Sequence, residues 1–416
     1  MDARQEELRR RLGALGFDEV AFARADAVPA AGFDRWLARG FHADMTWLER
    51  TAARRRDPRL VLPGVRSVIA LGVTYSGDRG PGTGDRRQGT GDGGPATGDR
   101  GWQGPEDERR PVWARYSLFE DYHDTFKPAL VAAGRVLEEL YGLDGRGYRY
   151  YVDTGPVLER GWAERAGIGF LGKNGMLISR RSGNWLLLGA ILTVAELEPD
   201  PPLAGPRRPE AESDRTGLGC GRCTRCLDAC PTQAIPAPGQ VDARRCISYH
   251  TIENRGVIPR GLRPGVGAHI FGCDVCLEVC PWNRFARAGR RMLLAARPAL
   301  AELGLRALLE MTPAAFADAF RGTAVKRLKL AGLLRNACVV AGNLAGGAGP
   351  AHELAEPLVA LAARASPIVR AHAVWAVFQV AGRPAADGLL ASARAQEQDP
   401  AVLAEYAAAE GAPGAT

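Results

Sequence analysis

The stretch Cys220–Pro231, CGRCTRCLDACP, decides how this chain is organised. Its four cysteines follow the spacing C-x2-C-x2-C-x3-C-P, by which a bacterial ferredoxin loop binds one [4Fe–4S] cluster and gives its fourth thiolate to a second cluster. A second half follows at Cys273–Pro281, with three cysteines spaced C-x2-C-x3-C-P. Cys246, between the two halves, can supply the missing ligand. The spacing therefore predicts a ferredoxin-like domain with two [4Fe–4S] clusters over residues 206–290.

The crossover of ligands between the halves predicts which thiolates bind each cluster. The first cluster is predicted to bind Cys220, Cys223, Cys226 and Cys280, and the second Cys230, Cys246, Cys273 and Cys276. Structural zinc also uses paired C-x2-C motifs, but it does not require a C-x2-C-x2-C run ending in Cys-Pro. Eight of nine cysteines in one region favour metal over disulfides in a reducing compartment. The ninth, Cys338, lies in an apolar helical pattern and is predicted to be a core residue.

The region before the cysteines, residues 1–205, mixes two kinds of apolar pattern. Ser67–Tyr75 and Trp185–Val194 are apolar runs of strand length, whereas His123–Tyr141 has apolar residues at helical spacing. These patterns predict an α/β or α+β domain. Within it, Gly77–Pro111 is rich in Gly, repeats Thr-Gly-Asp every seven residues and contains almost no apolar side chains. We interpret this stretch as a disordered insertion.

The region after the cysteines, residues 291–416, is rich in Ala and Leu and predicts helices. Leu333–Gly346 and Ile368–Gly382 align with each other at a spacing of 35 residues. This period is typical of stacked HEAT-like helix pairs, and a generic helical bundle is the alternative. The predicted fold class is therefore multidomain α+β, with a mixed first domain, a ferredoxin-like domain and a HEAT-like helical domain.

Charge is placed unevenly along the 416 residues. The whole chain carries 54 Lys and Arg against 47 Asp and Glu, a net of +7. Arg255–Ala345 alone carries fourteen Lys and Arg against five Asp and Glu, a net of +9. A basic segment in an otherwise near-neutral chain favours a phosphate-rich partner such as nucleic acid, although a solvated basic face is the alternative.

The sequence gives no reason to expect a membrane protein. The N-terminal stretch Met1–Asp26 mixes acids and arginines and predicts an amphipathic helix without the apolar core of a signal sequence. The longest apolar runs are about half of what a transmembrane helix needs. We therefore expect a cytoplasmic protein.

Two polar stretches of the first region contain residue types that catalyse proton transfer. Asp153 follows an apparent strand in RYYVDTGPVLER, and Arg160 lies shortly after it. An acid at a strand end can act as a proton donor if burial raises its pKa. The alternative is that Asp153 or Thr154 caps the next helix, and spacing alone favours the cap. The triplet Asp121–His123 has the same two interpretations.

Taken together, these motifs resemble epoxyqueuosine reductase, a family of cobalamin-dependent enzymes that modify tRNA. The resemblance covers nearly the whole chain outside Gly77–Pro111, and the block Cys246–Gly256 is its most specific part. The matching stretches are DYH at Asp121–His123, VDTGPVLERGWAERAGIGFLGKNGMLI at Val152–Ile178, CGRCTRCLDACPTQAI at Cys220–Ile235, CISYHTIENRG at Cys246–Gly256, GCDVCLEVCPWNRFA at Gly272–Ala286 and GLLRNACVVAGN at Gly332–Asn343.

The resemblance implies the reduction of epoxyqueuosine to queuosine at the wobble position of tRNA. It implies an α/β first domain with base-off cobalamin between it and the cluster domain, and electrons from a donor such as flavodoxin or ferredoxin. The motif D-x-H-x-x-G is absent at Asp121–Phe126, so no protein histidine is expected on cobalt. The protein is expected to be a monomer.

The resemblance also assigns roles to single residues. Asp153 matches the proton donor of the family, and Tyr122 and His123 match residues near the substrate. The predicted cobalamin contacts are Arg160, Lys173, Asn174 and Ser248. The basic helical tail suits a tRNA stem and loop, with predicted backbone contacts from Arg321, Lys326, Arg327, Lys329 and Arg335.

Two other functions stay open as alternatives. A reductive dehalogenase also combines cobalamin with two ferredoxin clusters, but that class usually has a twin-arginine signal and no helical-repeat tail. A non-catalytic electron-transfer protein would use the clusters as a relay, and it would leave Asp153 and the large first domain without a role.

Overall fold

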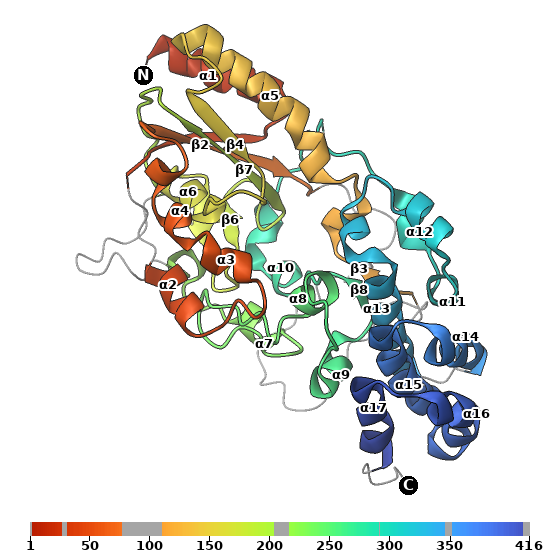
Figure 1. Cartoon of the computed structure of the whole chain (residues 1–416). Coiled ribbons are helices and arrows are strands. Elements are labelled where there is room, and N and C mark those ends of the chain that lie inside the picture. Colours follow the sequence, from red (N-terminus) through yellow and green to blue (C-terminus); the bar gives the residue numbers. More distant parts are fainter. Residues whose placement is uncertain are drawn as a thin grey trace.

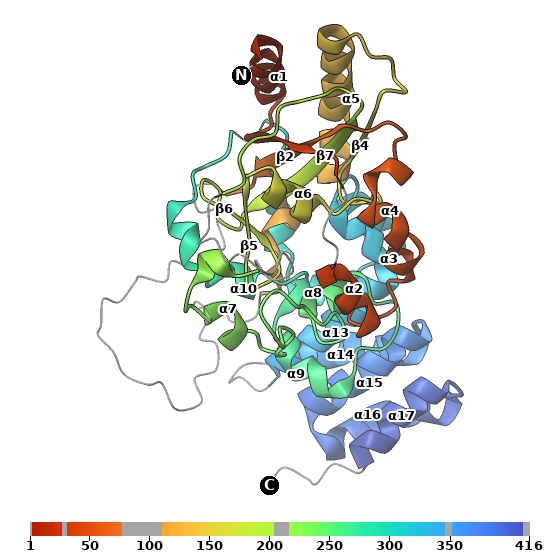
Figure 2. The same ribbon diagram turned by 90° about the vertical axis from the view of Figure 1, so that its left-hand side faces the viewer.

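Figures 1 and 2 show a computed structural model of the chain from two directions. The structure describes residues 2–26, 31–76, 110–203, 216–290, 292–345 and 352–410. The predicted insertion Gly77–Pro111 lies outside these residues, apart from its last two positions. No helix in the described part of the chain is long and apolar enough to cross a membrane.

A four-stranded sheet forms the centre of the first region. In spatial order its strands are β1 (Glu19–Arg24), β2 (Ser67–Thr74), β7 (Leu186–Thr193) and β4 (Tyr148–Tyr151). The two predicted apolar runs form β2 and β7, the central strands. Every neighbouring pair is antiparallel. The α/β prediction for this domain is therefore wrong and α+β is right, because an apolar run does not show the direction in which its strand pairs.

Helices cover both faces of this sheet (Figure 1). Because side chains of a strand alternate between faces, each strand contributes to two cores. α1 (Ala3–Ala14) and α5 (Tyr122–Tyr141) lie on the face that presents Phe22, Ile69, Leu71 and Ile191. α6 (Glu159–Arg165) lies on the face that presents Ala21, Val68, Ala70 and Leu192. The remaining elements of this region are α2 (Ala31–Ala38), α3 (Thr46–Arg50), α4 (Ala52–Arg56), β5 (Gly169–Leu171) and β6 (Leu177–Ser179).

The N-terminal stretch differs from its prediction as a single helix. α1 ends at Ala14, and Gly16 follows with a φ of 109°, which only glycine adopts readily. The next residues pair with β2 as strand β1, in which Phe22 is fully buried. Burial on the sheet therefore outweighs the helical pattern after Gly16.

The cysteine region consists of short elements joined by loops. They are α7 (Arg225–Asp228), α8 (Ile247–Ile252), α9 (Arg263–Val266), β8 (His269–Phe271) and α10 (Val275–Glu278). β8 pairs in parallel with β3 (Val112–Trp113), which ties this region to the first one. Ile247 and Ile270 pack in one hydrophobic core with Leu333 and Val340. That core crosses the predicted boundary between residues 290 and 291.

The C-terminal region is helical, as predicted. Its helices are α11 (Leu305–Leu309), α12 (Pro313–Ala319), α13 (Lys329–Leu344), α14 (His352–Arg364), α15 (Pro367–Ala381), α16 (Arg383–Gln396) and α17 (Pro400–Glu410). The two aligned repeats fall in α13 and α15, which pack against each other. Cys338 is fully buried in α13, which confirms its prediction as a core residue.

Candidate functional site

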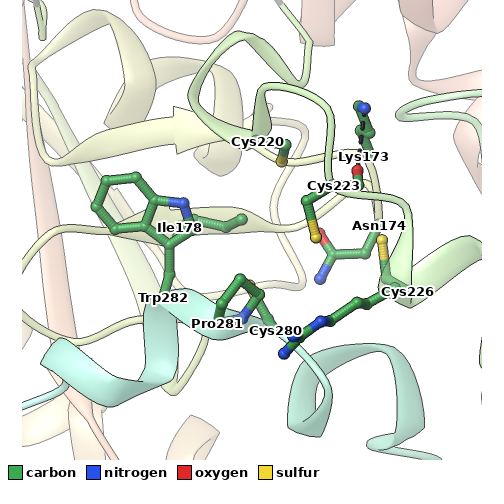
Figure 3. Close-up of a pocket in the computed structure, with 10 residues that line it drawn as sticks. Lys173, Asn174, Ile178, Cys220, Cys223, Cys226, Cys280, Pro281 and Trp282 are labelled. Atoms are coloured by element: carbon green, nitrogen blue, oxygen red, sulfur yellow. Dashed lines mark hydrogen bonds between the residues drawn. The ribbon is translucent and has the colours of Figure 1, made fainter. Parts of the chain in front are cut away.

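Four cysteine sulfurs line one cavity in the cysteine region (Figure 3). Cys220 and Cys223 come from the segment that leads into α7, Cys226 lies in α7 itself, and Cys280 comes from the loop after α10. α7 and α10 lie against each other, which brings the two loops together. The four thiols are those predicted for the first cluster, so the fold provides the crossover that the spacing implied.

The other four cysteines form a second, deeper group. Burial raises the pKa of the Cys276 thiol well above its ordinary value, and the nearby Cys273, Cys246 and Cys230 raise it further. The pKa of Cys273 is raised by burial and then by Cys246 and Cys230. These four thiols therefore lie within electrostatic reach of one another. Such thiols become thiolates only beside a strong positive charge, which iron supplies.

The two groups of four fit two iron–sulfur clusters. Within the described residues, no three His, Cys, Asp or Glu side chains are arranged to hold a single metal ion. The first four sulfurs instead surround a cavity, and a cubane cluster needs thiolates placed around it in this way.

A second polar site surrounds Asp153, in the loop between β4 and α6. Asp153 has a φ of 57°, a left-handed conformation that Asp tolerates better than most residues. It does not cap α6, which begins at Glu159 with Leu158 at its N-cap position. The cap interpretation of Asp153 is therefore wrong. Its carboxylate accepts a hydrogen bond of 2.9 Å from the Tyr122 hydroxyl.

Asp121, Tyr122 and His123 meet Asp153 at the beginning of α5. Asp121 caps the helix by accepting from the His123 backbone N–H, and its carboxylate also contacts His123 Nδ1 at 2.7 Å. His123 Nε2 lies 3.5 Å from Asp153 Oδ2, and the rings of Tyr122 and His123 stack at 4.1 Å. Asp121 therefore caps the helix, as one of its two interpretations predicts, and His123 lies between two carboxylates.

The two carboxylates determine where the proton resides. Burial would lower the pKa of His123, but Asp121 and Asp153 outweigh it and raise that pKa to about 9. Burial would raise the pKa of Asp153, but His123, Tyr122 and the positive charge of Arg327 bring it below its ordinary value. At neutral pH His123 is therefore protonated and Asp153 is ionised, which corrects the expectation that burial raises the pKa of Asp153.

Glu159 is a member of this site that the sequence reasoning missed. Burial, followed by the charge of Asp153, raises its pKa to about 7. Glu159 Oε1 is buried and has no hydrogen-bond partner among the described residues, and His123 Nε2, also buried, has only the 3.5 Å ion pair with Asp153 there. Buried polar atoms without partners are rare in proteins, so Glu159 Oε1 marks a place where a polar ligand fits. In the sequence, Glu159 could have been noticed as a site residue because it directly precedes Arg160, a predicted cobalamin contact.

The predicted cobalamin contacts separate into two groups. The exposed guanidinium of Arg160 donates to the Gly175 carbonyl, and the half-buried Ser248 lies in α8. Lys173 donates instead to the carbonyls of Gly221 and Cys223, at 2.8 and 3.0 Å, and so supports the loop of the first cysteine group.

Asn174 is held by bonds inside the protein, and its role as a cobalamin contact stays a prediction. Its side chain is buried, its amide nitrogen donates to Asn184 Oδ1 and to the Cys276 carbonyl, and its oxygen accepts from the Met176 N–H. Both amide hydrogens of Asn174 are used in these bonds, while its oxygen keeps a second lone pair and the residue lines the cavity of the first cysteine group. Asn174 therefore positions the cysteine loop.

The predicted tRNA contacts lie beside the Asp153 site, with one exception. Arg321, Lys326, Arg327 and Lys329 are exposed. The segment that carries them is tied to the beginning of α5, because the Asp121 N–H donates to the Gly322 carbonyl at 2.8 Å. Arg327 pairs with Glu253 at 2.8 Å and lowers the pKa of Asp153, so its charge reaches the site.

Arg335 is the exception and corrects the prediction. It is fully buried, and its guanidinium donates to the carbonyls of His250, Asn254 and Gly256 and to Asn336 Oδ1. It therefore holds the segment after α8 against α13 and cannot reach a phosphate.

Comparison with known proteins places the chain among proteins of one family. Residues 219–283 match the family model "4Fe-4S double cluster binding domain", and residues 55–154 match "Epoxyqueuosine reductase QueG, DUF1730". Epoxyqueuosine reductase from Burkholderia pseudomallei is 36% identical over 395 residues, which are 90% of this chain and 93% of that protein. The enzyme from Synechocystis sp. is 40% identical over 304 residues, which are 73% of this chain and 91% of that protein.

Solved structures agree with these relatives. A crystal structure of epoxyqueuosine reductase with an epoxyqueuosine-modified tRNA-Tyr stem loop superimposes with a TM-score of 0.78 at 27% identity, covering 97% of both chains. The Bacillus subtilis enzyme, in a form with its catalytic loop swung out of the active site, gives a TM-score of 0.77 at 27% identity over 97% of both chains. This chain therefore belongs to the epoxyqueuosine reductase family, which is a family of oxidoreductases.

Proposed function

We propose that this protein reduces epoxyqueuosine to queuosine in tRNA, with cobalamin and two [4Fe–4S] clusters as cofactors. The observation that carries the proposal is the group of Asp153, Tyr122 and His123, which lies beside an exposed basic segment and in the same fold as eight grouped thiols. Removal of the epoxide oxygen as water takes two electrons and two protons and leaves an alkene. The two thiol groups would hold the clusters that deliver the electrons. The acid site would supply the protons, and the basic segment would bind the tRNA.

The cofactors supply, when bound, single electrons at low potential and a metal centre that is reactive toward electrophilic carbon. The buried Glu159 Oε1, which has no hydrogen-bond partner among the described residues, supports a cofactor or substrate group beside Asp153. Arg160 and Ser248 stay our candidates for holding cobalamin.

The residues of the site would hold the proton and transfer it to the epoxide oxygen. His123 holds it at Nε2, 3.5 Å from Asp153 Oδ2, so Asp153 receives the proton from His123 and passes it to the epoxide oxygen. The Tyr122 hydroxyl fixes the orientation of the Asp153 carboxylate. Arg327, Lys326 and Lys329 would contact the phosphates of the anticodon loop near this acid.

The pH dependence of turnover tests the role of His123. Because its pKa is raised to about 9, His123 carries its proton below that pH and loses it above, so kcat/KM is expected to fall as the pH rises through about 9. His123→Gln is expected to lose this alkaline decrease and to lower kcat/KM roughly 100-fold at neutral pH. The measurement is a pH profile at saturating chemical reductant. An unchanged alkaline decrease in His123→Gln would contradict the assignment.

The corrected role of Arg335 gives a second prediction. Arg335→Met leaves several buried carbonyls without donors and is expected to lower the free energy of unfolding by roughly 2–4 kcal/mol, seen as a lower Tm. The affinity for tRNA, measured well below the Tm, is expected to stay unchanged. Arg327→Ala is the matched comparison, with lower tRNA affinity and an unchanged Tm. A loss of tRNA affinity in Arg335→Met without a change in Tm would restore the earlier assignment.

A reductive dehalogenase is the second candidate, and its substrate separates it from our proposal. The cobalamin-loaded protein is supplied with reductant and either epoxyqueuosine-containing tRNA or a chlorinated phenol. We expect turnover of the tRNA and no release of chloride. Chloride release without turnover of tRNA would favour the dehalogenase.

A further inference from the structure

Arginine and apolar side chains lie at the cavity of the first cysteine group, which Arg225 and Trp282 line, and in the chain segments next to its lining residues. We call this surface the arginine patch, and it consists of Leu218, Arg222, Arg225, Trp282, Arg284, Phe285 and Arg287. Leu218 is 38% exposed and Phe285 is 49% exposed. The Trp282 ring lies 5.8 Å from that of Phe285, and its indole N–H donates to the Gly219 carbonyl at 3.2 Å. Large apolar side chains are thus open to solvent directly beside the cavity.

The arginines of the patch are available for charges from outside. All four are exposed, and none forms an ion pair with any residue that the structure describes. The Arg284 guanidinium stacks on the Phe285 ring at 4.5 Å. Arg225 lines the cavity together with the cysteines. Asp228 of α7 is an exposed acid close in sequence, and its carboxylate accepts from the Thr224 hydroxyl, so four arginines against one acid leave the patch net positive.

The first cysteine group is also the outer of the two. Cys276 of the second group packs against the same hydrophobic core as Tyr122, whose hydroxyl donates to Asp153. Helix α7, which carries Arg225 and Cys226, lies apart from α14–α17 in both views (Figures 1 and 2). An electron entering at the patch would therefore reach the first group before the second and before the Asp153 site.

We infer that the arginine patch is the docking surface for an acidic, low-potential electron-carrier protein. The inference rests on the proposed function, because it requires clusters at the two thiol groups. In each docking event the carrier is oxidised by one electron and the first cluster is reduced by one electron. Two such transfers, with two protons, balance the removal of one epoxide oxygen as water.

The composition of the patch favours such a protein over tRNA. Arginine and aromatic side chains are enriched at protein interfaces, and complementary charge speeds the encounter of two proteins. The basic segment that suits phosphates lies elsewhere, between Arg321 and Lys329, where it is tied to Asp121 of the acid site. Exposed Leu218 and Phe285 have no counterpart on the phosphate backbone of RNA.

The test is a triple charge reversal, Arg222→Glu with Arg284→Glu and Arg287→Glu, in the full-length protein with clusters. Arg225 is left unchanged because it lines the cavity. The probe is a flavodoxin with an acidic face. Its Kd is followed through flavin fluorescence, and its hydroquinone reduces the clusters in a stopped-flow mixer without tRNA. We expect the Kd to rise and the reduction rate at low salt to fall at least about 10-fold each. Reduction by dithionite and the iron content are expected to stay unchanged.

Arg135→Glu, a reversal of an exposed charge on α5, is the matched control and is expected to leave both quantities unchanged. Flavodoxin binding and reduction that are unaffected by the triple reversal would overturn the inference. So would a loss of tRNA affinity with flavodoxin reduction intact, which would make the patch an RNA surface. If the patch governs flavodoxin reduction but no tRNA is turned over, the docking surface stands and only the proposed substrate fails.

Discussion

Asp153→Asn is expected to lower turnover of epoxyqueuosine-containing tRNA by at least about 100-fold, while tRNA affinity and iron content stay at their normal values. The amide keeps the size of the side chain and can still accept from the Tyr122 hydroxyl. It cannot receive the proton of His123 and pass it on. The measurement is single-turnover kinetics with excess enzyme, so that the chemical step is separated from tRNA release.

The backbone makes Asn the right replacement at this position. With a φ of 57°, the position tolerates Asn, whereas Ala adds about 1 kcal/mol of strain that would confuse stability with catalysis. Asp124→Asn, an exposed acid on the same helix as His123, is the matched control and is expected to keep full activity. Normal single-turnover rates in Asp153→Asn would remove Asp153 from the mechanism.

Cys280→Ala is expected to remove one cluster and all turnover that depends on electrons from a carrier protein. Cys280 lines the cavity with Cys220, Cys223 and Cys226, so its loss leaves three thiolates for the first cluster. The iron content is expected to fall from about eight to about four atoms per chain. The electron paramagnetic resonance spectrum of the reduced protein is expected to lose the interaction between two clusters.

Cys338→Ala is the control for this experiment, because Cys338 is fully buried in α13 and belongs to neither thiol group. It is expected to keep all iron and the normal spectrum. Cys276→Ala is expected to remove the other four iron atoms. Full iron content in Cys280→Ala would contradict the ligand partition.

Features that follow from the spacing of residues in a motif or repeat could be predicted from the sequence. The cysteine spacing predicted which sulfurs share a cavity, because the crossover is a property of the loop itself. The apolar runs predicted β2 and β7, and the 35-residue repeat predicted two packed helices, α13 and α15. In each case, a recognisable motif or repeat carries the information, even where, as with Cys280, it joins two segments of the chain.

Contacts between distant segments that no motif records could not be predicted. Asp153 meets Tyr122 and His123 across 31 and 30 positions, and this contact lowers a pKa that burial alone would raise. Arg335 has the positive charge that a tRNA contact needs. It is buried, however, and its guanidinium donates to carbonyls of α8 and of the segment that follows. A charged residue's role depends on what packs around it, which a single sequence does not show.

The most direct test of the proposed reaction is the mass of the modified nucleoside. Anaerobically prepared, iron-replete protein is incubated with epoxyqueuosine-containing tRNA and a strong reductant, with cobalamin present or omitted, and the digested nucleosides are weighed by mass spectrometry. We expect the nucleoside to lose one oxygen atom only when cobalamin is present. Intact clusters and bound cobalamin without any loss of oxygen would contradict the proposed function.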